Sequence, residues 1–220
     1  MIAAITKERL GAFSDGVFAV IITIMVLQFR LPPQPSFEAL LQQWPTALSY
    51  VVSYLLIVIM WINHHFLWSF AKHSTPRLIF WNFVHMICAS LVPFATAWVA
   101  ASRIAAVPVF VYAAVIVLVN LSYHGFAREV VPREELDGRG TRRRALTRSS
   151  ITLGLFAAAM FLSLRFPLVA FALVTCVLIT YARPEVPLSP VPRAAQRAAV
   201  SRSSSASNPL PRGSPQVGVA

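Results

Sequence analysis

The stretch from Arg9 to Leu27 places an arginine, a serine (Ser14) and an aspartate (Asp15) in the first third of a segment that is otherwise almost entirely apolar. If such a segment crosses a bilayer, a charged side chain within it costs roughly 2.5–3.5 kcal/mol even on lenient insertion scales. We therefore expect Asp15 to face protein or water, where it marks a candidate functional region.

Two further polar groups follow in the next apolar stretches. His64 and His65 are adjacent, and neighbouring residues on a helix point roughly 100° apart, so both cannot easily hold one metal ion. Asn82 and His85 are three residues apart and therefore share a helical face. Neither pattern predicts a metal site, but both place polar side chains at the depth of Asp15.

Together these groups predict one polar layer near the same end of three helices. Its members are polar or ionisable residues at similar depth, namely Arg9, Ser14, Asp15, Asn63, His64, Asn82 and His85. A bond between one of the histidines and a polar residue of the first segment would offset the desolvation of both groups. Such a layer can join helices through hydrogen bonds, and it can equally serve as a proton relay or an ion vestibule.

The elements that must position this layer follow from the composition. Of the 220 residues, 57% are hydrophobic and 12% are charged, whereas soluble domains are about 45–50% apolar. A helix needs about 20 residues to cross a hydrocarbon core of ~30 Å. Six apolar runs are candidates for such helices, the last of them short, at about 10–30, 47–71, 77–100, 104–127, 146–164 and 167–182. We predict an all-α integral membrane protein with a six-transmembrane-helix bundle over residues 1–182.

The positive charges predict the orientation of this bundle. If the N-terminus is inside, 16 of the 19 lysines and arginines fall in the segments on the inner side of the membrane. The other three, Arg30, Arg103 and Arg165, fall on the outer side. By the positive-inside rule this indicates cytoplasmic N- and C-termini. Residues 183–220 are rich in Pro, Ser, Ala and Arg, which predicts a disordered basic cytoplasmic tail.

Other classes of function find little support in the residues. The arginines lie at membrane edges and in the tail rather than on a folded basic face, so nucleic acid is not an expected partner. We see no nucleophile with its base, no phosphate-cradling glycine loop and no metal-ligand cluster, and we predict no catalytic residue, metal or cofactor. The two cysteines, Cys88 and Cys176, fall mid-span and are expected to be buried free thiols. The connection at about 128–145 is expected to be a solvated cytoplasmic loop, although Pro132 to Glu135 look like the start of a helix and Gly138 and Gly140 look like its stop.

The motifs at these positions resemble those of a known family. Their residues are Arg9-x-x-x-Phe13-Ser14-Asp15, Trp61-x-x-His64-His65, Asn82 and Pro93-Phe94-Ala-Thr96. The set resembles the endosomal and lysosomal potassium channel family (transmembrane protein 175) in its bacterial form, over about residues 5–182. The resemblance implies a homotetramer with a pore lined by the first helix and no pore loop. It also implies an interhelical network that orients the first helix without touching the ion, formed by Arg9, Phe13, Ser14, Asp15, His64 and Asn82.

Helical spacing then selects candidate pore residues on the first helix. Val20, Ile24 and Leu27 are four and three residues apart and form one stripe, and Thr23 lies beside them. The family usually has isoleucine at the constriction where this chain has Val20. Four apolar side chains around an axis can close a pore by dewetting, and a ring of four Thr23 hydroxyls can partly replace the hydration shell of potassium.

The resemblance, together with these residues, predicts a potassium-preferring cation leak channel of a bacterial inner membrane, which passes potassium and other monovalent cations and assembles with copies of itself in a lipid bilayer. Two alternatives remain open at this point. A secondary transporter or proton-conducting protein would use the layer of Asp15, His64 and His85 as a relay, although no inverted repeat or matched helix break is evident. A non-conducting scaffold would need that layer only to hold helices together.

Overall fold

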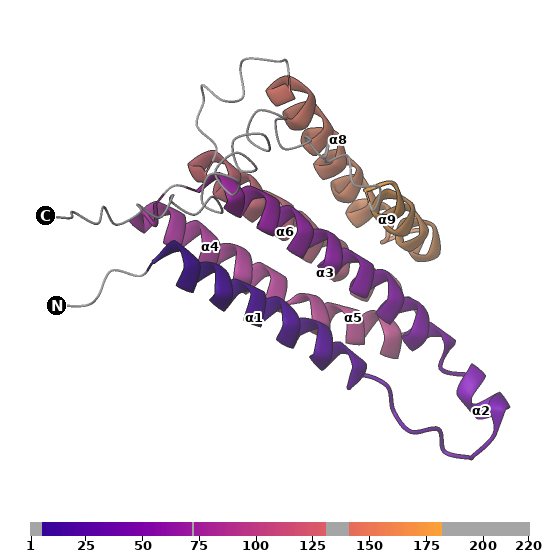
Figure 1. Ribbon diagram of the computed structural model, residues 1–220. Helices are drawn as coiled ribbons and strands as arrows, with labels where there is room; N and C mark the ends of the chain where they lie inside the picture. Colours follow the sequence, from indigo (N-terminus) through magenta and orange to yellow (C-terminus); the bar gives the residue numbers. More distant parts are fainter. Residues whose placement is uncertain (1–5, 72, 131–140, 182–220) are drawn as a thin grey trace, which may run out of the picture. The chain divides into compact units, whose positions relative to one another are not determined.

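The structure, a computed structural model, describes residues 6–71, 73–130 and 141–181. Within these ranges the regular secondary structure is helical, which confirms the all-α prediction. The helices follow the chain as α1 (Lys7–Val26), α2 (Phe37–Leu41), α3 (Trp44–Phe70), α4 (Pro76–Ser90), α5 (Val92–Ala101), α6 (Ala106–Val130), α8 (Thr141–Leu162) and α9 (Pro167–Tyr181) (Figure 1). The tail predicted at 183–220 and the helix start and stop signals at 132–140 lie outside the described residues.

Local sequence signals account for where several helices begin. The Thr6 side chain accepts a hydrogen bond from the Arg9 backbone N–H at the start of α1. Thr75 does the same for Leu78 at the start of α4. Threonine is a preferred N-cap residue because its oxygen satisfies one of the unpaired N–H groups of the first turn. The last described helix, α9, begins at Pro167. Proline is favoured at this position because the first N–H groups of a helix have no acceptor within the helix.

Four apolar stretches are long enough to cross a membrane, among the residues that the structure describes. They comprise α1, most of α3, the combined α4–α5 segment Pro76–Ala101, and α6. The break between α4 and α5 falls at Leu91, two residues before Pro93, which lacks a hydrogen-bond donor and interrupts the ladder of i→i−4 bonds. The apolar parts of α8 and α9 are shorter, at 10–17 residues. The six-span count therefore stays a prediction.

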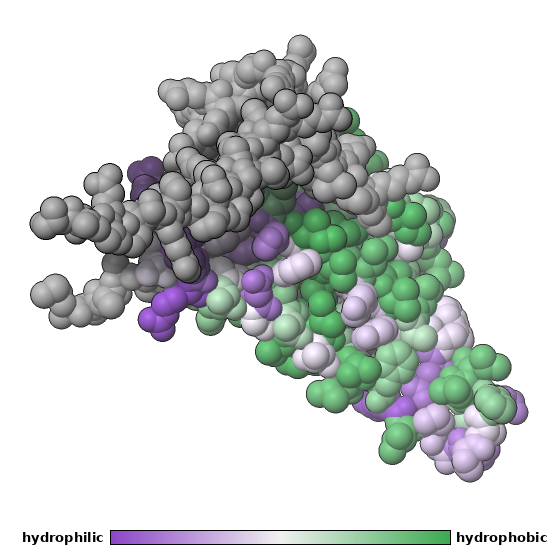
Figure 2. Space-filling view, viewed as in Figure 1, coloured by the Kyte–Doolittle hydropathy of each residue, from purple (hydrophilic) through white to green (hydrophobic). Residues whose placement is uncertain are grey.

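The spanning helices pack around a shared apolar core. Within it, α6 is central and contacts α4, α5 and α8, while α3 packs on α5 and α8 packs on α9. α1 contacts α3, α4 and α5 and lies on the opposite side of this bundle from α8 and α9 (Figure 1). Apolar residues cover the middle of the visible face, with hydrophilic residues toward its two ends (Figure 2). This distribution fits a bundle whose middle faces hydrocarbon.

Two glycines allow close contacts with tryptophan rings. A Cβ on Gly11 of α1 would lie 2.8 Å from Nε1 of Trp68 in α3, and a Cβ on Gly125 of α6 would lie 2.3 Å from Trp81 in α4. Both distances are shorter than real side-chain contacts, so any larger residue would force the ring or the helix to move. In contrast, Gly16 on α1 has open space around it.

The turn between α5 and α6 contains two residues in the left-handed region, Arg103 at φ 54° and Ile104 at φ 64°. This conformation is costly for a β-branched residue such as Ile104, whose side chain is nonetheless buried. The expectation that both cysteines are buried is wrong, because Cys176 is exposed and Cys88 is only partly buried.

Candidate functional site

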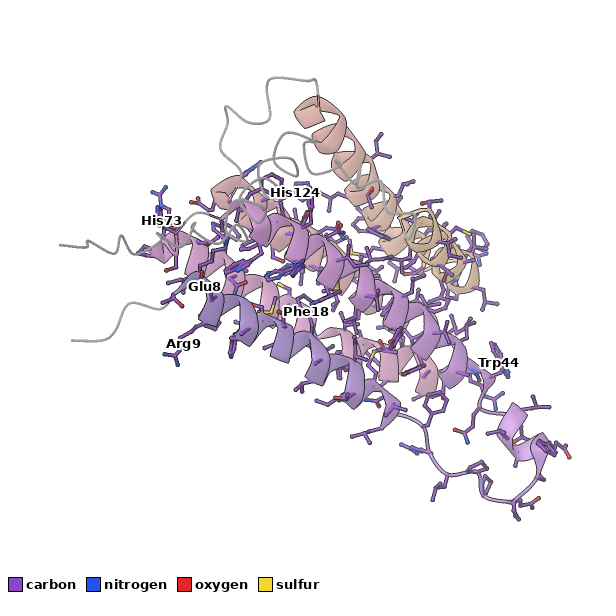
Figure 3. All side chains as sticks on the ribbon, viewed as in Figure 1. Glu8, Arg9, Phe18, Trp44, His73 and His124 are labelled. Atoms are coloured by element: carbon purple, nitrogen blue, oxygen red, sulfur yellow. The ribbon has the colours of Figure 1, made fainter. Side chains whose placement is uncertain are left out.

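The two sides of α1 differ in what they contact. One side is buried against the bundle and consists of Leu10, Ser14, Phe18, Ile21 and Met25. These positions are four, four, three and four residues apart, the spacing of a single helical face. Figure 3 shows the labelled Phe18 pointing into the bundle and the labelled Arg9 pointing away from it. The buried side contains one polar residue, Ser14, which is fully buried.

Ser14 is held by a hydrogen-bonded group that we call the α1 network, formed by Ser14, His64 and Asn82. The Asn82 amide Nδ2 donates to Ser14 Oγ at 3.0 Å, and Ser14 Oγ–H donates to the Leu10 carbonyl at 3.0 Å. Nε2 of His64 lies 2.8 Å from Asn82 Oδ1 and donates to it. The Ser14 hydroxyl proton, one Asn82 N–H and the His64 Nε2–H each have an acceptor in these bonds. The network ties α1 to α3 and α4.

Flat aromatic packing fixes the ring of His64 within this network. The ring is nearly parallel to those of His85 and Phe126, with centroids 5.9 and 5.1 Å away. Trp68 also stacks on it at 5.6 Å, and the ring edge of Phe18 meets it at the same centroid distance. His64 therefore has little freedom to rotate, because rings from α1, α3, α4 and α6 surround it.

His85 is also buried, but it bonds to a different helix. Its Nδ1 lies 2.9 Å from the Ser122 hydroxyl of α6, and that hydroxyl donates to the Val119 carbonyl at 2.8 Å. Since the hydroxyl has one proton, Nδ1–H of His85 is the donor in the first bond. The two histidines thus stack on each other while holding opposite sides of the bundle.

Asp15 lies outside the α1 network. Its carboxylate accepts a hydrogen bond of 2.9 Å from the indole N–H of Trp61 in α3, on an exposed surface. The expected partnership between Asp15 and a histidine is not formed: His64 bonds to Asn82, and His65 is exposed and lies beside the Trp61 ring, with centroids 5.6 Å apart. The physical reason is helical phase, because Asp15 follows Ser14 and points roughly 100° away from it.

Arg9 and Phe13 also stand apart from the α1 network. Both are exposed, and Phe13 contacts the ring of Phe83 at a centroid distance of 5.4 Å. Arg9 has no hydrogen bond to His64 or Asn82 in the part of the chain that the structure describes. The signature predicted from the sequence is therefore divided: Ser14 faces the bundle, and Arg9, Phe13 and Asp15 face outward.

The candidate pore residues form a continuous exposed surface on α1, which we call the pore stripe (Val20, Thr23, Ile24 and Leu27). In the single chain Val20 is 54% exposed, Ile24 43% and Leu27 77%. The hydroxyl of Thr23 donates to the Val20 carbonyl at 2.9 Å. This bond uses the single proton of the hydroxyl and leaves its oxygen lone pairs for a ligand in front of the helix.

A second buried polar group went unrecognised in the sequence. This hydroxyl cluster consists of Ser53 (α3), Thr96 (α5) and Tyr112 (α6), near the opposite end of the bundle from the α1 network. Thr96 Oγ1 lies 2.8 Å from Ser53 Oγ, which lies 2.9 Å from the Tyr112 hydroxyl. Isolated hydroxyls in apolar runs gave no periodic signal. Thr96 is 43 positions from Ser53 in the sequence and Tyr112 is 59 positions from it, so their contacts are visible only in the fold.

Long apolar helices joined by buried polar contacts define an integral membrane protein of the helical-bundle class. The family model described as endosomal/lysosomal potassium channel TMEM175 matches residues 9–93. A potassium channel of Chamaesiphon minutus is 31% identical over 137 residues, covering 58% of this chain and 68% of that protein. The chain therefore belongs to the TMEM175 family, whose members are ion channels rather than enzymes, and the resemblance seen in the sequence is confirmed.

Other relatives agree with this membership. A potassium channel of a Chryseobacterium species is 38% identical over 118 residues, which cover 54% of this chain and 62% of the relative. The chain thus matches less than two thirds of that protein. The crystal structure of a lysosomal potassium-selective channel TMEM175 homolog from Chamaesiphon minutus has a TM-score of 0.70 and 28% identity, covering 80% of this chain and 96% of that one. The helical fold is therefore that of a TMEM175 channel.

Proposed function

We propose that this protein is a potassium-preferring cation leak channel in which four copies of the chain surround an axis lined by α1. The observation that carries the proposal is the asymmetry of α1. One side is held in the bundle by the α1 network, while the pore stripe is left exposed by its own chain. A membrane helix anchored on one side and uncovered on the other is suited to face a shared axis.

The pore stripe supplies two kinds of surface to such an axis. Val20 and Ile24 would form apolar rings that resist wetting and limit conduction. Between them, Thr23 would present a hydroxyl oxygen whose proton is already bonded to the Val20 carbonyl. Four such oxygens can coordinate a partly dehydrated cation while each hydroxyl keeps its bond to the carbonyl. Potassium, which gives up its water more readily than smaller ions, is the cation we infer for this ring.

The remaining parts of the architecture follow from this arrangement and are also proposals. We infer a bacterial inner-membrane protein with residues 1–182 crossing six times, α8 and α9 forming the last two crossings, and both termini in the cytoplasm. Sixteen of 19 basic residues on one side support this orientation. Residues 183–220 are then a basic cytoplasmic tail. No cofactor is needed beyond the permeating ion.

The outward residues of the signature fit contacts between copies. When the pore stripe faces the axis, the sides of α1 next to the stripe face neighbouring copies. Asp15 and Trp61 lie on such a side, bonded to each other and exposed. We infer that this pair contributes to assembly, whereas the α1 network orients α1 inside each chain. Neither group would touch the ion.

Ion flux in liposomes under a potassium gradient tests the proposal. The expected result is current that reverses near the potassium potential, from a protein that is tetrameric in detergent. Saturable, proton-coupled flux would favour the transporter alternative. A strictly monomeric protein, or tetramers without flux, would contradict the channel proposal and favour a non-conducting scaffold.

A matched pair of variants sharpens this test. Thr23→Val removes the hydroxyl of the pore stripe and keeps the side-chain shape, so the preference for potassium over sodium should fall severalfold. Thr180 on α9 is likewise exposed and likewise donates to a carbonyl three residues earlier. Thr180→Val should therefore leave selectivity unchanged. Equal effects of the two substitutions would contradict the assignment of α1 to the pore.

A further inference from the structure

A small cavity lies behind the α1 network, on the side of His85 that faces away from α1. It has a volume of about 70 Å³ and is bounded by α3, α4, α6, α8 and α9. Most of its wall is apolar, but polar side chains from four helices reach it, namely Asn63, His85, Asn120, Tyr123 and Thr152. None of these residues belongs to the pore stripe or to the hydroxyl cluster.

One polar atom at this cavity has no partner. Nε2 of His85 is buried without a hydrogen bond, in a side chain that is 1% exposed. Because Nδ1–H donates to Ser122, Nε2 in the neutral ring is a bare acceptor. A buried acceptor left unsatisfied destabilises the folded state, so the structure favours an occupant that donates a hydrogen bond to this nitrogen.

The size and chemistry of the cavity select that occupant. One water requires roughly 10–15 Å³ and two to four polar partners, so the volume accommodates a few waters. Asn120 uses its amide N–H to bond the Ile116 carbonyl, which leaves its side-chain oxygen as an acceptor. The Asn63 amide offers both a donor and an acceptor. An acyl chain would fill the apolar wall but leave Nε2 of His85 unpaired.

We propose that this cavity binds water, and that one bound water donates to Nε2 of His85. The water would be the last member of a series of contacts across the bundle. His85 bonds Ser122 and stacks on His64, and His64 bonds Asn82, which bonds Ser14 on α1. With both ring nitrogens bonded, the plane of His85 is fixed, and with it the surface on which His64 packs. The site lies within one chain and does not depend on ion conduction.

Hydroxyl-radical footprinting tests the site, because radiolysis of a bound water oxidises the side chains that touch it. Met60 lines the cavity, whereas Met86 is equally buried, at 4% against 5% exposed, and does not line it. In the purified full chain, Met60 should be oxidised severalfold faster than Met86. Equal rates would overturn the proposal.

Two variants connect the water to His85. His85→Phe removes the acceptor, and Val119→Leu fills part of the cavity with a larger side chain. Each substitution should reduce the oxidation of Met60 to the rate of Met86. If His85→Phe does not fold, Val119→Leu alone decides, since it keeps every polar group. Unchanged Met60 oxidation in the folded Val119→Leu protein, or acyl-chain density beside Nε2 in a high-resolution structure, would show that the proposal is wrong.

Discussion

The α1 network and the hydroxyl cluster are both buried groups of three hydrogen-bonded side chains, but they join different helices. Ser14, His64 and Asn82 connect α1 to α3 and α4. Ser53, Thr96 and Tyr112 connect α3, α5 and α6, and none of them contacts α1 through a hydrogen bond. The α1 network therefore joins α1 to its neighbours, whereas the hydroxyl cluster joins the helices behind α1 to one another.

This difference predicts which substitutions should alter ion conduction and which should alter stability alone. A defect in the α1 network should move the pore stripe, because α1 has no other buried polar contact with the bundle among the described residues. A defect in the hydroxyl cluster should weaken packing while the pore stripe stays in place. The following predictions test that separation, beginning with the largest expected effect.

Asn82→Leu should have the largest effect. The substitution leaves the buried His64 ring N–H without its acceptor, at a cost of about 1–3 kcal/mol, and removes the Asn82 N–H from the Ser14 hydroxyl, which keeps its bond to the Leu10 carbonyl. We expect both loss of thermal stability in detergent and loss of potassium flux in liposomes. If flux per tetramer is normal in the surviving protein, the α1 network does not orient the pore helix.

Gly11→Ala should have the next largest effect, through the contact between α1 and α3. The new Cβ would meet Nε1 of Trp68 at 2.8 Å, and that ring is stacked against His64 and Phe126 and cannot easily move. Overpacking of this kind costs about 1–3 kcal/mol.

Gly16→Ala is the matched control for this change, on the same helix and with open space around it. It should raise the unfolding temperature slightly, because alanine is favoured over glycine inside a helix by about 0.5–1 kcal/mol. The melting temperatures of the two variants should therefore shift in opposite directions. A shift of the same sign would contradict the close packing of Gly11.

Tyr112→Phe should have a smaller and purely structural effect. It removes one hydroxyl from the hydroxyl cluster and leaves the Ser53–Thr96 bond, so we expect a loss of about 0.5–1.5 kcal/mol in stability. Potassium selectivity and flux per tetramer should match the unsubstituted protein. A change in selectivity would show that the two polar groups are coupled and that their division of roles is wrong.

Arg103→Gly should have the smallest effect, and of opposite sign. Arg103 is exposed and lies in the left-handed region at φ 54° in the turn between α5 and α6. Glycine adopts this conformation without steric cost, although it gains entropy when unfolded. We expect a net gain of up to about 1 kcal/mol, seen as a higher melting temperature with unchanged flux. A loss of stability would indicate that the arginine side chain itself holds the turn.

Some features of the candidate site were accessible from the sequence because they depend on local spacing. Asn82 and His85 share a face, as three-residue spacing requires, and both are buried. His64 and His65 point in different directions, and one is buried while the other is exposed. The partner of Asp15 was not accessible, because an indole donor on another helix has no signature in composition or charge.

The sequence by itself determined the membrane class and the helical elements, because runs of about 20 apolar residues leave the backbone no other way to satisfy its hydrogen bonds in hydrocarbon. It also determined the family, because the signature residues are local motifs. Only the tertiary structure decided which polar residues meet: that Ser14 bonds Asn82, that Asp15 bonds Trp61, and that Ser53 joins Thr96 and Tyr112. These contacts depend on the rotation and depth of each helix against its neighbours. Side-chain packing sets that register, whereas helical period alone leaves it free.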